Sequence, residues 1–355
     1  MAVLIPIAIS TAISLGASLL ISALQPKPPG IERNKQDTRI QSSEYGTPIT
    51  RGYGTFRTAG TLIWEAGTGL VDHVTTQHTG GGKRRGPDVT THSYTVSCAL
   101  LVCAGPVQGI TRIWADTDLI YNSATLGAVT TTLTNNGNPG LSIYIGDELQ
   151  MPNSWIVADK GVGNVSAHRG YCYVVFKDLN LDRFGDRIPT FTFEVVQGTV
   201  AVADVVTAEC ALVGLTSASL NLTQCTDPVR GMVINKQQAP RVALEELARD
   251  FWCDFVDVDG QIKGVKRPQT TYGLINALDL AAYEEGGEAP EQLDATRGLA
   301  LDIPRTVEVT YFDYNRLYEN GKQTFSRQVP GSQQVLAVDT PLVMTAPEAD
   351  KLAKI

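Results

Sequence analysis

Short apolar stretches separated by glycine, proline and small polar residues fill the chain from residue 41 to about residue 200. This pattern is typical of β-strands joined by turns. Helices are not expected within residues 41–64, because glycine and proline recur too often there for a helical apolar stripe to develop. We therefore expect a mainly β region in the first part of the protein. Its predicted strands lie within residues 41–64, 93–103, 110–115, 171–176 and 190–196.

Two polar segments interrupt this β region. Residues 66–92 are rich in glycine, threonine, aspartate and histidine, and they predict an exposed loop or hairpin insertion. Residues 123–168 begin with threonine, asparagine and glycine and contain one short apolar run, at residues 142–145, that predicts a further strand. We expect both segments to be insertions into a β-rich domain over residues 31–200.

A helical pattern appears over residues 240–253. Side chains at helical spacing share one side of a helix and can bury it against a core. With the elements that follow, this helix predicts an α+β second domain over residues 201–355. The positions at helical spacing are Val242, Leu244 or Glu245, Leu247, Ala248 and Phe251.

A hairpin, a later strand and a last helix complete the second domain. Residues 254–258 and 261–266 predict two strands, and Asp259-Gly260 between them is a favoured two-residue turn. Residues 307–312 alternate as a strand. Thr345-Ala-Pro-Glu348 is a capping box that opens the last helix. The sequence ends within this helix, so we expect the polypeptide to continue.

The first charged residue is Lys27, so residues 2–26 form a long uncharged segment. A helix of this length would reach roughly the 30 Å of the hydrocarbon core of a bilayer. A secretory signal peptide is the competing interpretation, but no basic residue precedes the apolar run. We expect residues 1–30 to form a hydrophobic helix followed by a proline-rich linker.

Small residues recur along this predicted helix. Serines stand at every fourth position and therefore share one face, with further small side chains beside them. Such spacing lets helices approach closely in membrane or pore-lining bundles. It fits equally a buried amphipathic helix whose serines bond to its own carbonyls. The candidates for helix packing or pore lining are Ser10, Ala12, Ser14, Gly16, Ser18 and Ser22.

Charge and cysteine content narrow the functional classes. The net charge of −8 and the pI near 5.1 argue against a surface built to grip nucleic acid, which requires clustered lysine and arginine. The six cysteines form no C-x-x-C pair and no cluster with histidine at metal-ligand spacing. We expect free thiols in a protein that is assembled in a reducing cytoplasm.

Two motifs resemble ligand sites, but each lacks a residue that the site requires. Gly80–Lys83 is similar to part of a phosphate loop, but Arg84 follows the lysine and Gln77 stands where the first glycine should be. Asp257–Gly260 is similar to part of a calcium loop, but Phe255 occupies the first ligand position. Neither motif predicts a cofactor, and the second is better interpreted as a turn.

No catalytic constellation is apparent. The sequence lacks a nucleophile elbow and a zinc-protease motif, and its carboxylates are scattered singly. Histidines near Asp72 would bind a metal only adventitiously, and Lys83-Arg84-Arg85 is typical of a solvated loop tip. We expect no enzymatic activity, no cofactor and no metal. The four histidines are His73, His78, His92 and His168.

Three separated stretches carry a family resemblance. They are Gln41–Ile49, Gly109–Asp116, and Arg169–Phe176 continuing to Arg183–Pro189. In this order they resemble the N-terminal hub region of the tail-tip proteins of long-tailed phages. The similarity is strongest to the baseplate-hub proteins of gene transfer agents and related siphophages, and more distant to the lambdoid host-specificity protein.

The resemblance covers residues 35–200 well and 230–355 loosely, and it departs at Thr117, where the family usually has a turn glycine. It implies a mainly β fold with an α+β second domain, as a multi-domain tail hub preceded by a hydrophobic N-terminal helix. It also implies a structural virion protein without catalysis.

By the same resemblance, the chain would form a homotrimeric ring at the virion tail tip, after assembly in the host cytoplasm. The ring would contact the distal tail protein, other tail-tip proteins and the C-terminus of the tape-measure protein. It would close the tail tube and open for genome delivery, and DNA would pass through without specific binding. The N-terminal helix would plug the lumen or insert into the host membrane.

Two other classes stay open at this point. The first is an exported β protein anchored in a membrane by residues 2–25. The second is the non-catalytic part of a tail-associated cell-wall hydrolase.

Overall fold

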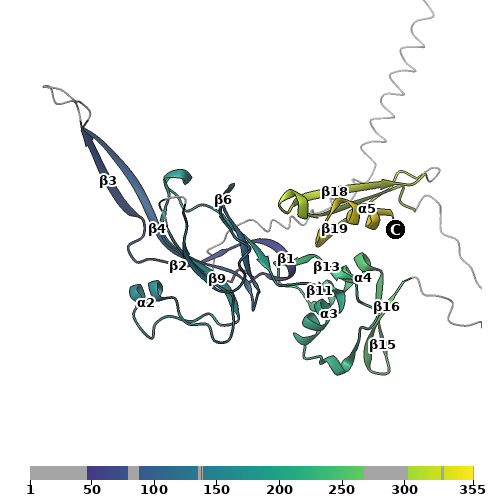
Figure 1. Ribbon diagram of the computed structural model, residues 1–355. Helices are drawn as coiled ribbons and strands as arrows, with labels where there is room; N and C mark the ends of the chain where they lie inside the picture. The colour runs from purple at the N-terminus through teal and green to yellow at the C-terminus, as the bar shows by residue number, and fades with distance from the viewer. Residues whose placement is uncertain are drawn as a thin grey trace, which may run out of the picture. The chain divides into compact units, whose positions relative to one another are not determined.

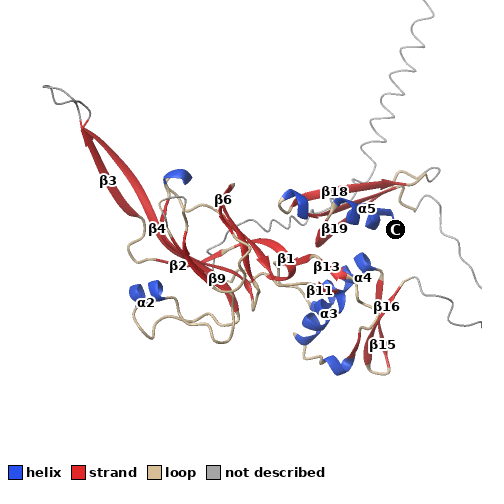
Figure 2. Cartoon of the chain, in the orientation of Figure 1, coloured by secondary structure: helices blue, strands red, loops and turns tan. Residues whose placement is uncertain are grey.

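Strands dominate the secondary structure in the computed structural model (Figures 1 and 2). All described residues belong to one of the two compact units of the chain, Thr38–Ile355. The N-terminal helix expected within residues 1–30 lies outside them. The described residues are 46–78, 88–134, 137, 139–267, 303–328 and 332–354.

An eight-stranded sheet draws strands from both halves of the sequence, in the order β18-β17-β19-β14-β1-β10-β5-β6. Neighbouring strands are antiparallel except β17 and β19, which are parallel. Strands before and after residue 200 therefore share one hydrogen-bonded sheet. Its members are β1 (Arg51–Ala59), β5 (Gly109–Ala115), β6 (Asp118–Asn122), β10 (Phe191–Val196), β14 (Gly231–Ile234), β17 (Thr306–Asp313), β18 (Glu319–Ser326) and β19 (Val335–Met344).

A six-stranded sheet has the order β2-β4-β9-β8-β7, with β3 also paired to β4. Figure 1 shows β3 and β4 as a long ribbon. This ribbon is the hairpin that the polar segment at residues 66–92 predicts. The strands are β2 (Thr61–Glu65), β3 (Val71–His78), β4 (Asp88–Ala104), β7 (Val129–Thr132), β8 (Gly140–Tyr144) and β9 (Tyr171–Asn180).

One hydrophobic core contains side chains from both of these sheets. Phe56 of β1, Leu100 of β4 and Phe193 of β10 are completely buried within it. The rings of Phe176 and Phe191, from β9 and β10, stack with their centroids 4.7 Å apart. Each fully buried side chain of this size contributes about 2–3 kcal/mol through loss of water contact. Apolar side chains of the predicted strands therefore pack against one another between the two sheets.

A second core is built from elements after residue 200. Helices α3 (Val202–Ala211), α4 (Pro240–Phe251) and α5 (Ala346–Lys354) contribute to it together with β14, β17 and β19. The smaller sheets are β12-β16-β15 and β11-β13. Their strands are β11 (Val200–Ala201), β12 (Leu220–Asn221), β13 (Pro228–Val229), β15 (Cys253–Val258) and β16 (Gln261–Lys266). The remaining helices are α2 (Ser154–Lys160) and the short η1 (Asp182–Phe184), η2 (Ser217–Ser219) and η5 (Tyr314–Arg316).

Most of the predicted elements are confirmed. The predicted strands correspond to β1, β2, β4, β5, β8, β9, β10 and β17, and the two predicted helices to α4 and α5. The hairpin β15–β16 turns at Asp259 and Gly260, whose φ angles of 53° and 75° are those of a tight two-residue turn. All six cysteines are buried, and their thiols are free in this structure.

The face that α4 buries agrees with the predicted one in part. Leu247 is buried, and Leu244 and Phe251 pack against the second core, as predicted. Val242 is exposed instead, whereas Ala243 and Asp250 are buried. Apolarity alone does not identify Asp250 as an inner position, because carboxylates are seldom buried.

Helix α3 and strand β7 were not predicted. The buried residues of α3 are Val202, Val205, Val206, Glu209 and Cys210, which follow the spacing of one helix face. Glu209 interrupts that apolar face with a charge, which weakens the pattern. Strand β7 is a run of mostly exposed threonines and offers no apolar alternation.

Glu209 joins α3 to β1. Its side chain has no exposed surface and accepts hydrogen bonds from Arg51 Nη2 at 3.1 Å and from the Tyr53 hydroxyl at 2.7 Å. Burial first, and the neighbouring Glu209 second, raise the pKa of Tyr53 well above its usual range, so the hydroxyl keeps its proton and donates. A buried carboxylate of this kind is stable only while both of its partners remain.

Glu209→Ala should lower the free energy of unfolding by about 2–4 kcal/mol, because Arg51 and Tyr53 lose their shared acceptor where water is excluded. Glu245→Ala is the matched control. The contact of Glu245 with Arg241 is solvent-exposed, so its loss should lower the free energy of unfolding by less than about 0.5 kcal/mol. Denaturant unfolding of both variants measures the difference, and equal losses would show that Glu209 is not a structural link.

Candidate functional site

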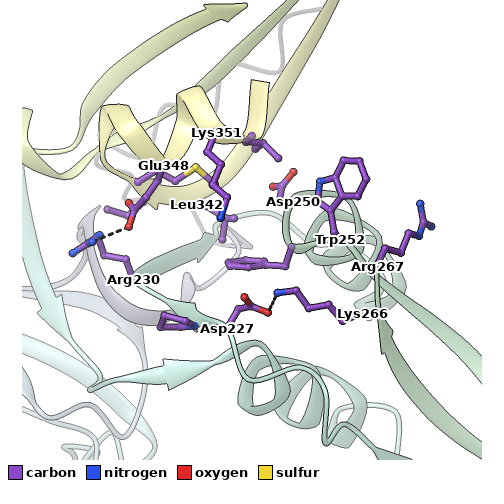
Figure 3. Close-up of a pocket in the computed structure, with 14 residues that line it drawn as sticks. Asp227, Arg230, Asp250, Trp252, Lys266, Arg267, Leu342, Glu348 and Lys351 are labelled. Carbon is purple, nitrogen blue, oxygen red and sulfur yellow. Dashed lines mark hydrogen bonds and ion pairs between the residues drawn. The ribbon is translucent and has the colours of Figure 1, made fainter. Parts of the chain in front are cut away.

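A cavity of about 500 Å³ opens among the elements of the second core (Figure 3). Phe251, Leu342, Met344 and Leu352 supply its apolar wall. They come from the end of α4, from β19 and from α5. The volume lies within the roughly 300–1,000 Å³ that is typical of ligand pockets. The cavity is therefore large enough to accept several apolar side-chain atoms.

Salt bridges frame this cavity. Lys266 Nζ pairs with Asp227, and Arg230 Nη2 lies 2.9 Å from Glu348 Oε1; both contacts are drawn as dashed lines in Figure 3. Arg230 also stands over the ring of Tyr314, 5.1 Å from its centroid. Because opposite charges compensate along the rim, the cavity does not concentrate charge of one sign.

Asp250 is buried beside the cavity. Its side chain has no exposed surface and accepts hydrogen bonds from Arg249 Nε at 2.7 Å and from the Thr340 hydroxyl. Arg249 Nη2 also donates to the carbonyl oxygen of Asp339 at 3.1 Å. This carboxylate thus ties α4 to β19, and its oxygens are engaged in structural contacts.

Glu348 has two roles at the rim. The backbone N–H and the hydroxyl of Thr345 donate to its Oε2 at 2.7 and 2.9 Å, which confirms the capping role predicted for Glu348. Partial burial acts to raise the pKa of Glu348, but the hydrogen bonds from Arg230 and Thr345 outweigh it and lower the pKa below the usual range. The same carboxylate therefore caps α5 and binds the start of β14 through Arg230.

This arrangement is suited to holding an apolar group. The charged side chains just described serve salt bridges or a helix cap. Among the residues that the structure describes, no cluster of three or more histidine, cysteine, aspartate or glutamate side chains is placed to hold a metal ion. What the cavity offers is apolar contact surface inside a frame of paired charges.

Two of the three stretches that carry the family resemblance, here called the signature stretches, contact each other next to the pairing of β5 with β10. Asp116, directly after β5, accepts from Arg187 Nη2 at 2.8 Å and from the Thr190 N–H at 2.9 Å. The left-handed residue of this turn is Asp116, with φ 53°. Thr117 is tolerated in place of the usual glycine because Asp116 adopts the strained conformation.

Trp114, also in a signature stretch, is buried between two guanidinium groups. Arg57 Cζ lies 4.0 Å from the ring centroid and Arg112 Cζ lies 5.7 Å away. Cation–π contacts of this kind contribute about 1–2 kcal/mol when partly desolvated. Arg57 Nη1 also donates to the Leu317 carbonyl at 3.0 Å, so the signature region is linked to the loop before β18.

Most of the site residues predicted from the sequence do not line the cavity. The helix-packing candidates Ser10, Ala12, Ser14, Gly16, Ser18 and Ser22 and the loop tip Lys83–Arg85 lie outside the described residues. Of the histidines, His92 contacts Asp72 at 2.9 Å, and His73 contacts the Thr95 hydroxyl at 2.9 Å. They stand in the paired strands β3 and β4, and not in the loop that is one of the two structures expected for residues 66–92.

The cavity itself was not predicted. Its wall comes from segments more than a hundred residues apart, and the sequence marks only Phe251, as a helix-face position, and Glu348, as a cap. Within the described ranges, no helix has the length and apolarity needed to span a membrane.

Comparisons with known proteins agree with the resemblance. A family model described as "Putative phage tail protein" matches residues 239–355. A chain from the virion of a native gene transfer agent particle has the same fold, with a TM-score of 0.71 at 21% sequence identity. That match covers 99% of this chain and 84% of the other. No curated protein matches the sequence. The predicted similarity to phage and gene transfer agent tail proteins is confirmed.

The Arg230–Glu348 contact should make stability depend on pH. Because the pKa of folded Glu348 is lowered, its stabilisation is present above the unfolded-state pKa of roughly 4.3 and is lost as pH falls through the folded value. Because the pair is partly exposed, Arg230→Gln should lower the free energy of unfolding by less than about 1 kcal/mol at pH 7. The difference in the free energy of unfolding between the variant and the parent protein, measured by urea unfolding, should become smaller toward pH 3. A difference that does not change with pH would contradict this account.

Proposed function

We propose that this chain is a structural protein of a phage-type tail and forms the hub at the tail tip. The observation that carries the proposal is the fold shared over nearly the whole chain with a chain of a gene transfer agent virion. The family match over residues 239–355 supports it independently. The three signature stretches narrow the tail role to the hub.

A tail hub must be a rigid and chemically inert body, and two features of the described residues favour these properties. One sheet runs through strands from both halves of the sequence. The buried carboxylates Glu209 and Asp250 bond to structural partners. These features favour a non-enzymatic role. The net charge of −8 would also reduce adhesion of DNA during its passage.

In this proposal, three copies surround the tail axis beneath the distal tail protein. They contact other tail-tip proteins and the C-terminus of the tape-measure protein, close the tube and then open for genome delivery. The apolar cavity beside α5 is suited to accept an apolar side chain from such a neighbour, because its wall is apolar and two ion pairs, Arg230–Glu348 and Lys266–Asp227, compensate charges at its rim.

Averaged cryo-EM density of tail tips should show this chain in three copies around the axis. Threefold density that fits β1, β10 and β14 of each copy is the expected result. Sixfold density, or a single copy lying off the axis, would remove the hub proposal. Density for the chain elsewhere in the particle would remove the tail-tip location as well.

The N-terminal segment extends the proposal. We propose that three copies pack along the face of Ser10, Ser14, Ser18 and Ser22 inside the closed hub, with Ala12 and Gly16 as further small residues of the same helix. About twenty apolar or small residues would be costly to expose to water, at about 25 cal/mol per Å² of apolar surface. Small side chains would permit the close approach of the helices.

Leu substitutions separate this packing from a simple membrane anchor. Ser14→Leu with Ser18→Leu should reduce infectivity at least about tenfold and disturb tip density, because added bulk forces the helices apart. Ala23→Leu, on the opposite side of the helix from the serine face, is the control and should leave particles infectious. If both sets of particles are equally infectious with unchanged density, the packing model is wrong and an anchoring role is favoured.

A further inference from the structure

Two buried cysteines lie next to each other in the second core. The sulfur atoms of Cys225 and Cys253 are 3.8 Å apart, and both side chains are completely buried. The two residues are 28 positions apart in sequence. Cys225 lies between β12 and β13, and Cys253 begins β15. Two thiols in contact are a potential redox site, and neither the fold nor the tail role requires them to be adjacent.

Gly264 makes room for this pair. A Cβ atom at position 264 would lie 2.3 Å from the sulfur of Cys225. Gly264 stands opposite Phe255 on β15, so the missing side chain leaves a depression over β16 that the thiol fills. The Cys225 sulfur is therefore held against the hairpin and beside Cys253 by the local backbone.

We propose that Cys225 and Cys253 form an intramolecular disulfide when the protein meets a low-molecular-weight disulfide outside the reducing compartment in which it folds. Only a short movement is required. A disulfide has an S–S distance of about 2.05 Å, so the sulfurs must approach by roughly 1.8 Å. Rotation of the two side chains can supply this without a change of strand pairing.

The contacts around the pair indicate the order of events. The Cys225 thiol donates its hydrogen bond to the sulfur of Cys253. Burial raises the pKa of Cys253, but the Cys225 hydrogen bond and the neighbouring Lys266 ammonium act in the opposite direction. Burial and the adjacent Cys253 raise the pKa of Cys225 to about 12. Cys253 is thus the more acidic thiol of the pair and the better attacking group.

The reaction is a pair of thiol–disulfide exchanges. Cys253 loses its proton and attacks one sulfur of the small disulfide, which forms a mixed disulfide and releases one thiolate. Cys225 then loses its proton and attacks the Cys253 sulfur, which releases the second thiolate. The protein loses two electrons and two protons in total, and one small disulfide becomes two thiols.

The bond would join the two sides of the cavity. Cys225 stands two residues before Asp227, and Cys253 follows Trp252, and both of those neighbours line the cavity. Closing a loop of this length restricts the unfolded chain, which should raise the melting temperature by roughly 5 °C. The disulfide would restrain the backbone beside Asp227 and Trp252, which line the cavity.

The other cysteines provide internal comparisons. Cys103 and Cys172 are opposite each other on β4 and β9, and their side chains are also hydrogen-bonded, so this pair is the competing linkage that peptide mapping must distinguish from Cys225–Cys253. Cys98 and Cys210 lie on different elements, β4 and α3. Cys210→Ser is therefore a control that removes a buried thiol without touching the proposed pair.

Incubation of the full chain with oxidised glutathione tests the proposal. The experiment includes urea well below the unfolding transition, so that the buried thiols open transiently. The intact mass should fall by about 2 Da, and four thiols should remain of the original six. Peptide mapping without reduction should recover a Cys225–Cys253 linkage, with the same linkage in Cys210→Ser.

Three results would overturn the proposal. The first is retention of all six thiols under these conditions. The second is a linkage that joins other cysteines. The third is glutathione attached to Cys253 with no internal bond. Cys225→Ser should instead trap glutathione on Cys253 and abolish the thermal shift. Because the readouts are mass and linkage, the result does not depend on whether the chain forms a tail hub.

Discussion

The pairing of β1 with two strands at once is the constraint on which the rest of the structure depends. Its first residues pair with β14 and its last residues pair with β10, both antiparallel. Residues along β1 alternate between buried and half-buried positions. The crossing is close: a Cβ at Gly231 would lie 2.1 Å from the Thr55 carbonyl oxygen, and one at Gly54 would lie 2.3 Å from that of Arg230. Glycine at both positions lets the two backbones approach.

Because β1 stands between them, the strands before residue 200 and the elements after it are held in one sheet. Two side-chain links reinforce the join. Glu209 of α3 bonds to Arg51 and Tyr53 of β1, and Arg57 of β1 bonds to the Leu317 carbonyl while it stacks on Trp114. A passive structural component gains from this arrangement, since load applied to either core is carried by backbone hydrogen bonds and packed side chains.

Local patterns in the sequence predicted most elements but not how they combine. Strands with apolar alternation and the Asp259-Gly260 turn are set by neighbouring residues, so the sequence shows them directly. The pairing of β1 with β14 joins residues far apart in sequence, and no local pattern encodes it. Helix α3 was missed because Glu209 carries a charge on its buried face, and the cavity because its wall is assembled from distant segments. The division into domains at residue 200 and the packing of Ser10 to Ser22 stay predictions.

Native-state hydrogen exchange across the shared sheet tests this account most directly. If β1 unites both cores, the slowest amides of β10, β1 and β14 should open together, with one common free energy close to that of global unfolding. Amides of β17 and β19 should follow the same dependence on denaturant. The account would be contradicted if β14, β17 and β19 opened in a separate event at clearly lower free energy while β1 and β10 stayed protected.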